Sequence, residues 1–136
     1  MKEIYVDGSC QHQYGQGSWA VVMNDGEYSG KLYKEDIDAP YCELFALKQA
    51  LLITQGCIEN IVIYTDNDGI YTTLHKTEEK FEQRLKKRGK RAIKNKDIFS
   101  TVYKLYHSSY RVIIKRIPRI LNEAADSLAK KTLKSD

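Results

Sequence analysis

Four acidic side chains occupy positions from which they could perform chemistry together: Asp7, Glu43, Asp66 and Asp126. An inward-facing carboxylate is costly to bury unless a partner compensates its charge. For any one of them, an arginine or the backbone donors of a helix N-terminus would be compensation enough. For four that converge, a divalent cation is the better explanation, because hard oxygen ligands suit Mg²⁺ or Mn²⁺. Two such ions about 4 Å apart would clamp the attacking and leaving oxygens of a phosphodiester.

Two of these carboxylates are predicted to lie at the ends of β-strands. Residues 2–9 alternate in hydrophobicity as a strand does, and Asp7 lies near the end of this segment. The nearly continuous apolar run over residues 60–66 predicts a central strand that is buried on both faces and ends at Asp66. Ligands of open α/β sheets usually bind beyond the carboxyl ends of strands, so the position of Asp66 favours a site.

The other two carboxylates are predicted to lie on helices. A helix over residues 43–54 places Glu43 on the same apolar stripe as Leu47, so its carboxylate should point toward the sheet. Asn122 is predicted to cap a final helix that carries Asp126 in its second turn, beside another apolar stripe. Whether these carboxylates meet those on the strands depends on the fold.

The pattern of the whole chain predicts an α/β fold. Strands are expected at 2–9, 18–23, 27–34, 60–66 and 111–116, and helices at 43–54, 67–75, 97–106 and 122–133. The turn sequence Asn24-Asp25-Gly26 makes the first three strands an antiparallel meander. The later strands alternate with helices, which implies a five-stranded mixed sheet with helices on both faces. The 136 residues suit a single domain, which we expect to span 1–136.

Charge is unevenly distributed along the chain. The net charge is +4, but residues 76–96 contain ten Lys or Arg against three Glu, a local charge of +7. The rest of the chain therefore carries +4 − 7 = −3. On charge alone, this basic block is equally compatible with a surface that binds a polyanion and with a solvated helix face.

Cysteine usage and hydropathy indicate the compartment. Cys10, Cys42 and Cys57 are odd in number and lack C-x-x-C spacing, so they are expected to be reduced thiols rather than disulfides or zinc ligands. No apolar run approaches the roughly 20 residues of a membrane span, and the N-terminus enters strand-like sequence at once. We therefore expect a cytoplasmic protein with no signal peptide and no membrane partner.

With these residues identified, the chain resembles the type 1 ribonuclease H family over nearly its whole length. Four segments carry the resemblance in the order that the family has: Tyr5-Val6-Asp7-Gly8-Ser9-Cys10, Glu43-Leu44-Phe45-Ala46-Leu47, Ile63-Tyr64-Thr65-Asp66 and Asn122-Glu123-Ala124-Ala125-Asp126-Ser127-Leu128-Ala129. The resemblance implies a ribonuclease H-like fold and hydrolysis of the RNA strand of RNA–DNA hybrids, giving 5′-phosphate and 3′-hydroxyl ends. It implies that the catalytic residues Asp7, Glu43, Asp66 and Asp126 hold two Mg²⁺ ions, which Mn²⁺ can replace.

The basic block, about residues 76–96, resembles the basic handle of that family, which grips the DNA strand. The resemblance implies two groups of substrate-binding residues. Gly8, Ser9 and Cys10 would supply backbone groups that read the 2′-hydroxyls of RNA. DNA phosphates would be bound by Lys86, Lys87, Arg88, Lys90, Arg91 and Asn95. Phosphate contacts of this kind give affinity without sequence preference.

Two departures from the family pattern stand out. Where relatives carry Thr, Asn or Gln before the catalytic Glu, this chain has Asp38-Ala39-Pro40, and Asp38 would repel a phosphate. A histidine that many relatives place before the last helix is missing from residues 116–121, as in a shorter, His-free version of that connection. We expect activity with slower turnover, in which Arg119 is either a substrate contact or a solvated surface charge.

Three other interpretations remain open at this point. The chain could be a nuclease of the same fold with relaxed or different substrate choice, which the altered loop before Glu43 favours. It could be a non-cleaving module that binds hybrids, although a pure binder gains nothing from an acidic cluster that faces phosphates. It could also be a domain of a reverse transcriptase. The initiating Met1 and the polar tail favour a stand-alone protein, which we expect to be a monomer.

Overall fold

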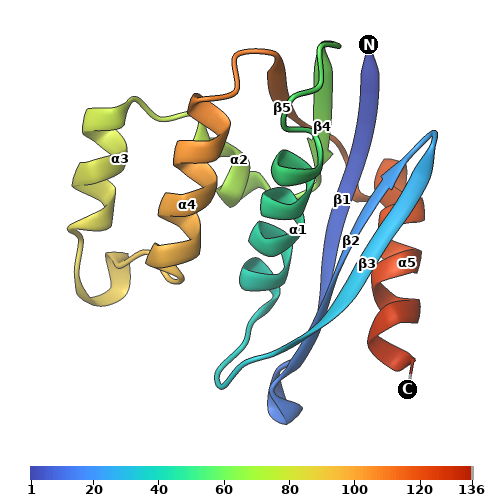
Figure 1. Ribbon diagram of the computed structural model, residues 1–136. Coiled ribbons are helices and arrows are strands. Elements are labelled where there is room, and N and C mark those ends of the chain that lie inside the picture. Colours follow the sequence, from blue (N-terminus) through green and yellow to red (C-terminus); the bar gives the residue numbers. More distant parts are fainter. Residues whose placement is uncertain (136) are drawn as a thin grey trace.

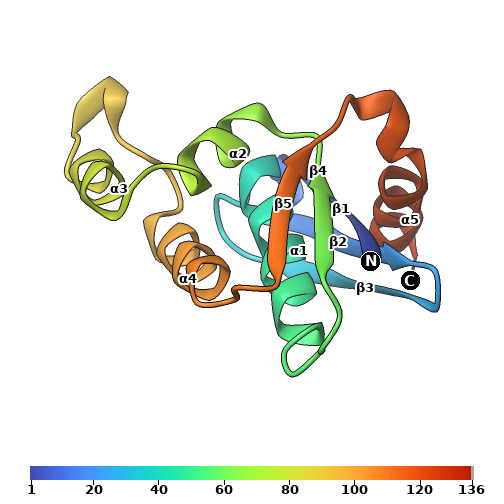
Figure 2. The same ribbon diagram turned by 90° about the horizontal axis from the view of Figure 1, so that it is seen from above.

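Five strands form one mixed sheet in the order β3-β2-β1-β4-β5 (Figures 1 and 2). The computed structural model describes residues 1–135 except the side chain of Arg91, so Arg91's predicted phosphate contact lies outside the described part. The first three strands are antiparallel and the last two pair in parallel, so the predicted sheet is confirmed.

The antiparallel half is a meander of β1 (Lys2–Gln11), β2 (Gln16–Met23) and β3 (Gly26–Tyr33). A short 3₁₀ helix, η1 (His12–Tyr14), joins the first two strands and ends at Gly15, whose φ of 62° lies in the left-handed region that glycine adopts without strain. β1 becomes the centre of the sheet because β4 pairs with its other edge.

The parallel half consists of β4 (Ile61–Thr65) and β5 (Val112–Arg116). Ile61, Val62 and Ile63 are at most 3% exposed, as expected for a central strand covered on both faces. Because β1, β4 and β5 run in the same direction, their carboxyl ends lie at one edge of the sheet. The fold thus brings the end of β4 beside the middle of the longer β1.

Helices cover both faces of the sheet. α1 (Ala39–Ile53) packs on one face and α5 (Glu123–Lys134) on the other, as Figure 2 shows from above. α2 (Asp68–Leu74) follows β4, and α4 (Lys96–His107) packs against α1 on the side away from the sheet. Among residues 1–135, no helix has the length and apolar character needed to cross a membrane.

The basic block contains a helix that the charge pattern did not predict, α3 (Glu78–Leu85), followed by the 3₁₀ helix η2 (Gly89–Arg91). Thr77 caps α3 by accepting a hydrogen bond from the backbone N–H of Lys80. Phe81 is 3% exposed and stacks on Tyr103 of α4, with ring centroids 4.0 Å apart. This aromatic contact attaches the basic block to the rest of the molecule.

Two helix starts differ from expectation. The helix expected over 97–106, with Asp97 as its predicted cap, begins at Lys96 as α4; Asn95 occupies the cap position in the left-handed region, so Asp97 lies within the first turn. Asn122 precedes α5 but makes no side-chain cap bond. The side chains of both asparagines are engaged elsewhere, Asn95 with Asp38 and Asn122 with β1 and Asp66.

Candidate active site

The sheet register brings Asp7 and Asp66 side by side. Tyr5 of β1 pairs with Tyr64 of β4 in the parallel ladder; Asp7 lies two residues further along β1, and Asp66 lies two residues beyond Tyr64, directly after the end of β4. Asp7 is 5% exposed and accepts a hydrogen bond from the backbone N–H of Gly8 at 2.9 Å. Two carboxylates from neighbouring strands therefore face the same edge of the sheet.

Glu43 joins this pair from the second turn of α1. One carboxylate oxygen each from Asp7, Glu43 and Asp66 lies within 4.8 Å of the other two. α1 can approach β1 this closely because Gly8 has no side chain: a Cβ there would lie 2.6 Å from Cys42 and from the backbone nitrogen of Glu43. Close packing of the α1 backbone on β1 thus places the Glu43 carboxylate beside those of Asp7 and Asp66.

Replacing Gly8 with alanine is expected to destabilise the protein by about 2 kcal/mol, because the new methyl group must displace the backbone of α1. The midpoint of thermal unfolding measures this effect. Gly26→Ala is the matched control, since a Cβ at Gly26 meets no atom closer than 3.6 Å. Equal midpoints for the two variants would contradict the close-packing role of Gly8.

Two asparagines orient the carboxylates. Asn67 Nδ2 donates to Glu43 Oε2 at 2.6 Å, while Asn67 Oδ1 caps α2 by accepting from the backbone N–H of Ile70 at 2.8 Å. Asn122 is buried and its Nδ2 donates both to the carbonyl of Val6 at 2.8 Å and to Asp66 Oδ2 at 3.1 Å. The sequence showed Asn67 only as the start of a helix, although an asparagine directly after Asp66 was a usable signal.

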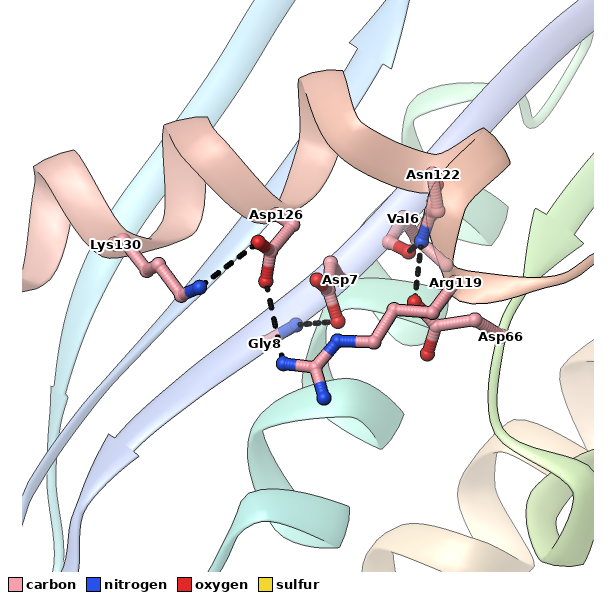
Figure 3. A network of polar contacts seen from close by, with 8 residues as sticks. All are labelled: Val6, Asp7, Gly8, Asp66, Arg119, Asn122, Asp126 and Lys130. Atoms are coloured by element: carbon pink, nitrogen blue, oxygen red, sulfur yellow. Dashed lines mark hydrogen bonds and ion pairs between the residues drawn. The ribbon is translucent and has the colours of Figure 1, made fainter.

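Asp126 stands at the edge of the cluster. Figure 3 shows its carboxylate facing Asp7 from α5. Lys130, one turn further along α5, is 3.0 Å away, and the exposed guanidinium of Arg119 is 3.8 Å away. The structure therefore brings all four predicted carboxylates to one place, with Asp7, Glu43 and Asp66 grouped and Asp126 paired with cations.

Burial and mutual repulsion perturb the protonation of the cluster. Burial, with the neighbouring Asp66 carboxylate, raises the pKa of Asp7 to about 8. Burial raises the pKa of Glu43 to about 7, although the hydrogen bond from Asn67 opposes the shift. Burial also acts on Asp126, but the Lys130 ammonium, the hydrogen bond with Asp7 and the charge of Arg119 together outweigh it and lower the pKa of that carboxyl. Without a cation, the cluster cannot hold all its negative charge at neutral pH.

The carboxylates line a cleft of about 350 Å³. The predicted backbone contacts Gly8, Ser9 and Cys10 line the same cleft, as do Ala39, Asn67, Arg119 and Lys130. The described handle side chains, those of Lys86, Lys87, Arg88 and Lys90, are exposed beyond α3 and do not line it. Asn95 is half-buried, and its Nδ2 donates to Asp38 Oδ1 at 3.0 Å.

The donor set suits a hard divalent cation. Carboxylate oxygens are the ligands that Mg²⁺ and Mn²⁺ prefer, and three of them lie within 4.8 Å of one another. A cation would also relieve the repulsion that raises the pKa of Asp7 and adds to that of Glu43. The arrangement is therefore a candidate metal centre at the floor of an open cleft, where it could act on a phosphodiester.

A family model and a curated relative that match this chain both carry the name ribonuclease H. Residues 1–134 match the family model described as RNase H. A protein named ribonuclease H from Hahella chejuensis is 31% identical over 138 residues, which cover 93% of this chain and 89% of the relative.

Two solved structures show the same fold. One is described as the foamy viral protease-reverse transcriptase in complex with dsDNA, with a TM-score of 0.80, 18% identity, and coverage of 98% of this chain and 94% of that one. The other is LC11-RNase H1 in complex with an RNA/DNA hybrid, with a TM-score of 0.69, 19% identity, and coverage of 98% and 96%. At these identities the likeness concerns the fold alone.

Proposed function

Because this chain belongs to the ribonuclease H family, we propose that it hydrolyses the RNA strand of RNA–DNA hybrids in the cleft that Asp7, Glu43, Asp66 and Asp126 line. It is a ribonuclease H enzyme, and the observation that carries the assignment of its site is the convergence of three carboxylates within 4.8 Å. The expected products carry 5′-phosphate and 3′-hydroxyl ends.

The proposal includes two Mg²⁺ ions, which Mn²⁺ can replace, held by Asp7, Glu43, Asp66 and Asp126. When bound, such ions stabilise the negative charge that develops on phosphate oxygens during hydrolysis. The protein fixes the ligands: Asn67 holds Glu43, Asn122 holds Asp66, and the N–H of Gly8 holds Asp7. These bonds keep the carboxylates in place before any ion arrives, which lowers the cost of organising the site.

Substrate is proposed to extend from the cleft to the handle. Backbone groups of Gly8, Ser9 and Cys10 line the cleft, where they would meet the RNA strand. The exposed cations of residues 86–90 would meet phosphates of the DNA strand. With this handle and no histidine before α5, we assign the chain to the type 1, His-free group of the family. Arg119, 76% exposed on its side chain and beside Asp126, lies in the connection over residues 116–121 that carries no histidine.

Neutralising two handle cations, Lys86→Gln with Lys87→Gln, is expected to raise the Kd for a hybrid several-fold at low salt. The slope of log Kd against log salt should fall by roughly 0.9 for each phosphate that the variant no longer binds. Fluorescence anisotropy in EDTA measures both quantities without cleavage. The control variant, Lys2→Gln with Arg111→Gln, removes the same amount of positive charge. These residues lie near the amino ends of β1 and β5, whereas the carboxylates lie toward the carboxyl ends of the parallel strands. Equal effects of the two pairs would contradict a localised handle.

The function is tested with a labelled RNA–DNA hybrid beside matched RNA and DNA duplexes, each in Mg²⁺ and in EDTA. Metal-dependent cutting of only the RNA strand of the hybrid is the expected result. Equal cutting of the hybrid and the DNA duplex would point instead to a nuclease of the same fold with relaxed substrate choice. Binding of the hybrid without cutting in either Mg²⁺ or Mn²⁺ would mean that the chain is a binding module.

A further inference from the structure

Two cations of the protein flank the carboxylate of Asp126. Lys130 Nζ lies 3.0 Å from Asp126 Oδ2, and Arg119 Nη2 lies 3.8 Å from Asp126 Oδ1 (Figure 3). Among the described residues, the group of carboxylates that meet within 4.8 Å of one another does not include Asp126. Each oxygen of this fourth carboxylate therefore already faces a positive charge that the chain itself supplies.

Lys130 is the better placed of the two cations. It follows Asp126 by four residues on α5, so the two side chains lie on one face of the helix, with the acid nearer the N-terminus as such pairs prefer. Ala129, the residue before Lys130, is completely buried, and its carbonyl accepts a hydrogen bond from Ser18 Oγ of β2 at 2.6 Å. This contact fixes the turn of α5 from which Lys130 lines the cleft.

The ammonium of Lys130 can be displaced from this position. Its side chain is 53% exposed, and exposed ion pairs contribute little to stability, so the ammonium can move into solvent at low cost. A divalent cation carries twice the charge of the ammonium and attracts the same carboxylate more strongly at an equal distance. Lys130 is thus a resident cation at Asp126 that an incoming divalent ion must replace.

We infer that Lys130 competes with the second divalent ion for Asp126 and so makes the two ions bind in sequence. The inference rests on the proposed two-ion centre. Asp7, Glu43 and Asp66 can hold a first ion together, whereas Asp126 is available to a second ion only when the ammonium has left its Oδ2. If the Lys130–Asp126 pair is formed about 70–90% of the time, it raises the apparent Kd of the second ion about 3- to 10-fold.

Lys130→Gln tests the inference in a titration with Mn²⁺, whose EPR signal reports the ion that stays free in solution. Glutamine keeps most of the side chain and removes the charge. The Kd of the second Mn²⁺ is therefore expected to fall about 3- to 10-fold, while the Kd of the first changes less than about twofold. Lys130→Arg keeps the charge and the reach to Asp126, so it should bind the second ion as weakly as the unaltered protein does. An unchanged second Kd in Lys130→Gln overturns the inference.

Lys131→Gln is the matched control. Lys131 is the next residue of α5, is exposed and does not line the cleft, so its substitution removes the same charge without touching Asp126. Both Kd values should stay nearly unchanged in this variant. If Lys131→Gln strengthens the second ion as much as Lys130→Gln does, or if Lys130→Gln strengthens both ions equally, net charge explains the effect and the inference is wrong. Thermal unfolding in EDTA checks that each variant is folded.

The number of bound ions separates this inference from the proposed function. One bound Mn²⁺ in the unaltered protein and two in Lys130→Gln would support the competition, whereas one bound ion in both proteins would overturn it. Cleavage of a hybrid by the unaltered protein is assayed separately, because the Mn²⁺ titration contains no nucleic acid. A protein that binds two ions and fails to cut hybrids would defeat the proposed function, while the comparison of Kd values would still decide the role of Lys130.

Discussion

Replacing Asp66 with asparagine is expected to slow cleavage of the hybrid by at least about 10³-fold. Asp66 is one of the three grouped carboxylates, so its loss removes a ligand of the proposed metal centre. Asparagine has nearly the same shape and still offers an oxygen to Asn122 Nδ2, so the fold should persist. Single-turnover cleavage at saturating enzyme separates this chemical effect from any change in binding.

Asp68→Asn is the control for this substitution. Asp68 lies two residues further along the chain, is exposed, and pairs with Arg116 at 2.9 Å outside the cleft. Its loss should leave cleavage within about twofold of the unaltered rate, because exposed ion pairs contribute little. An Asp66→Asn protein that folds and keeps more than a tenth of the rate would show that chemistry occurs elsewhere.

The positions of Asp7, Glu43 and Asp66 could be predicted because each depends on a local pattern. Alternation of hydrophobicity placed Asp7 on a strand, an apolar run placed Asp66 at a strand end, and helical spacing placed Glu43 toward the sheet. These patterns also indicated the mixed sheet, since a meander followed by alternating helices and strands leaves few arrangements. Local periodicity therefore placed each carboxylate on its strand or helix, whereas their approach to one another depended on the fold.

The supporting hydrogen bonds could not be predicted in the same way. Asn67 and Asn122 are polar side chains whose partners lie 24 and 116 residues away in sequence, at Glu43 and Val6. The position of Asn67 directly after Asp66 was a signal, but nothing near Asn122 distinguishes an asparagine that caps a helix from one that reaches across the fold. Asn122 was predicted as a cap for this reason, and only the tertiary structure shows its role.

Helix α3 was missed for a related reason. Its sequence is dominated by charge, and Phe81 is its one buried residue, so an apolar stripe is hardly visible. Thr77 followed by two glutamates was a usable start signal, because a threonine cap and acidic residues in the first turn stabilise a helix N-terminus. The charge pattern indicated that this segment could bind a polyanion, and the Thr77 cap would have indicated that it forms a helix.

In the altered loop before Glu43, the structure links two residues that the sequence presented separately, Asp38 and Asn95. The sequence showed that Asp38 would repel a phosphate. The structure adds that Asp38 accepts a hydrogen bond from the side-chain amide of Asn95, the residue that was predicted to bind a phosphate. Two separate predictions about substrate binding thus become one linked interaction, which neither residue type reveals by itself.

The free energy of unfolding of the metal-free protein is expected to fall as pH rises from about 4 to about 8. The pKa of Asp7 is raised from 3.8 to about 8 in the folded protein, and that of Glu43 from 4.5 to about 7. Between the unfolded and folded values, the folded state holds more protons than the unfolded state, so raising the pH favours unfolding. The loss should be on the order of 2–4 kcal/mol across this range. Thermal unfolding in EDTA at several pH values measures it.

Added Mg²⁺ should reverse most of this loss, because a cation that binds the ionised cluster stabilises only the folded state. The increase in unfolding temperature on adding about 10 mM Mg²⁺ should therefore be several degrees at pH 8 and close to zero at pH 5, where Asp7 and Glu43 are protonated. Asp7→Asn should flatten the pH dependence and reduce the response to Mg²⁺ together, whereas Asp68→Asn should leave both unchanged. A response to Mg²⁺ that is equal at pH 5 and pH 8 would mean that the ion binds somewhere other than this carboxylate cluster.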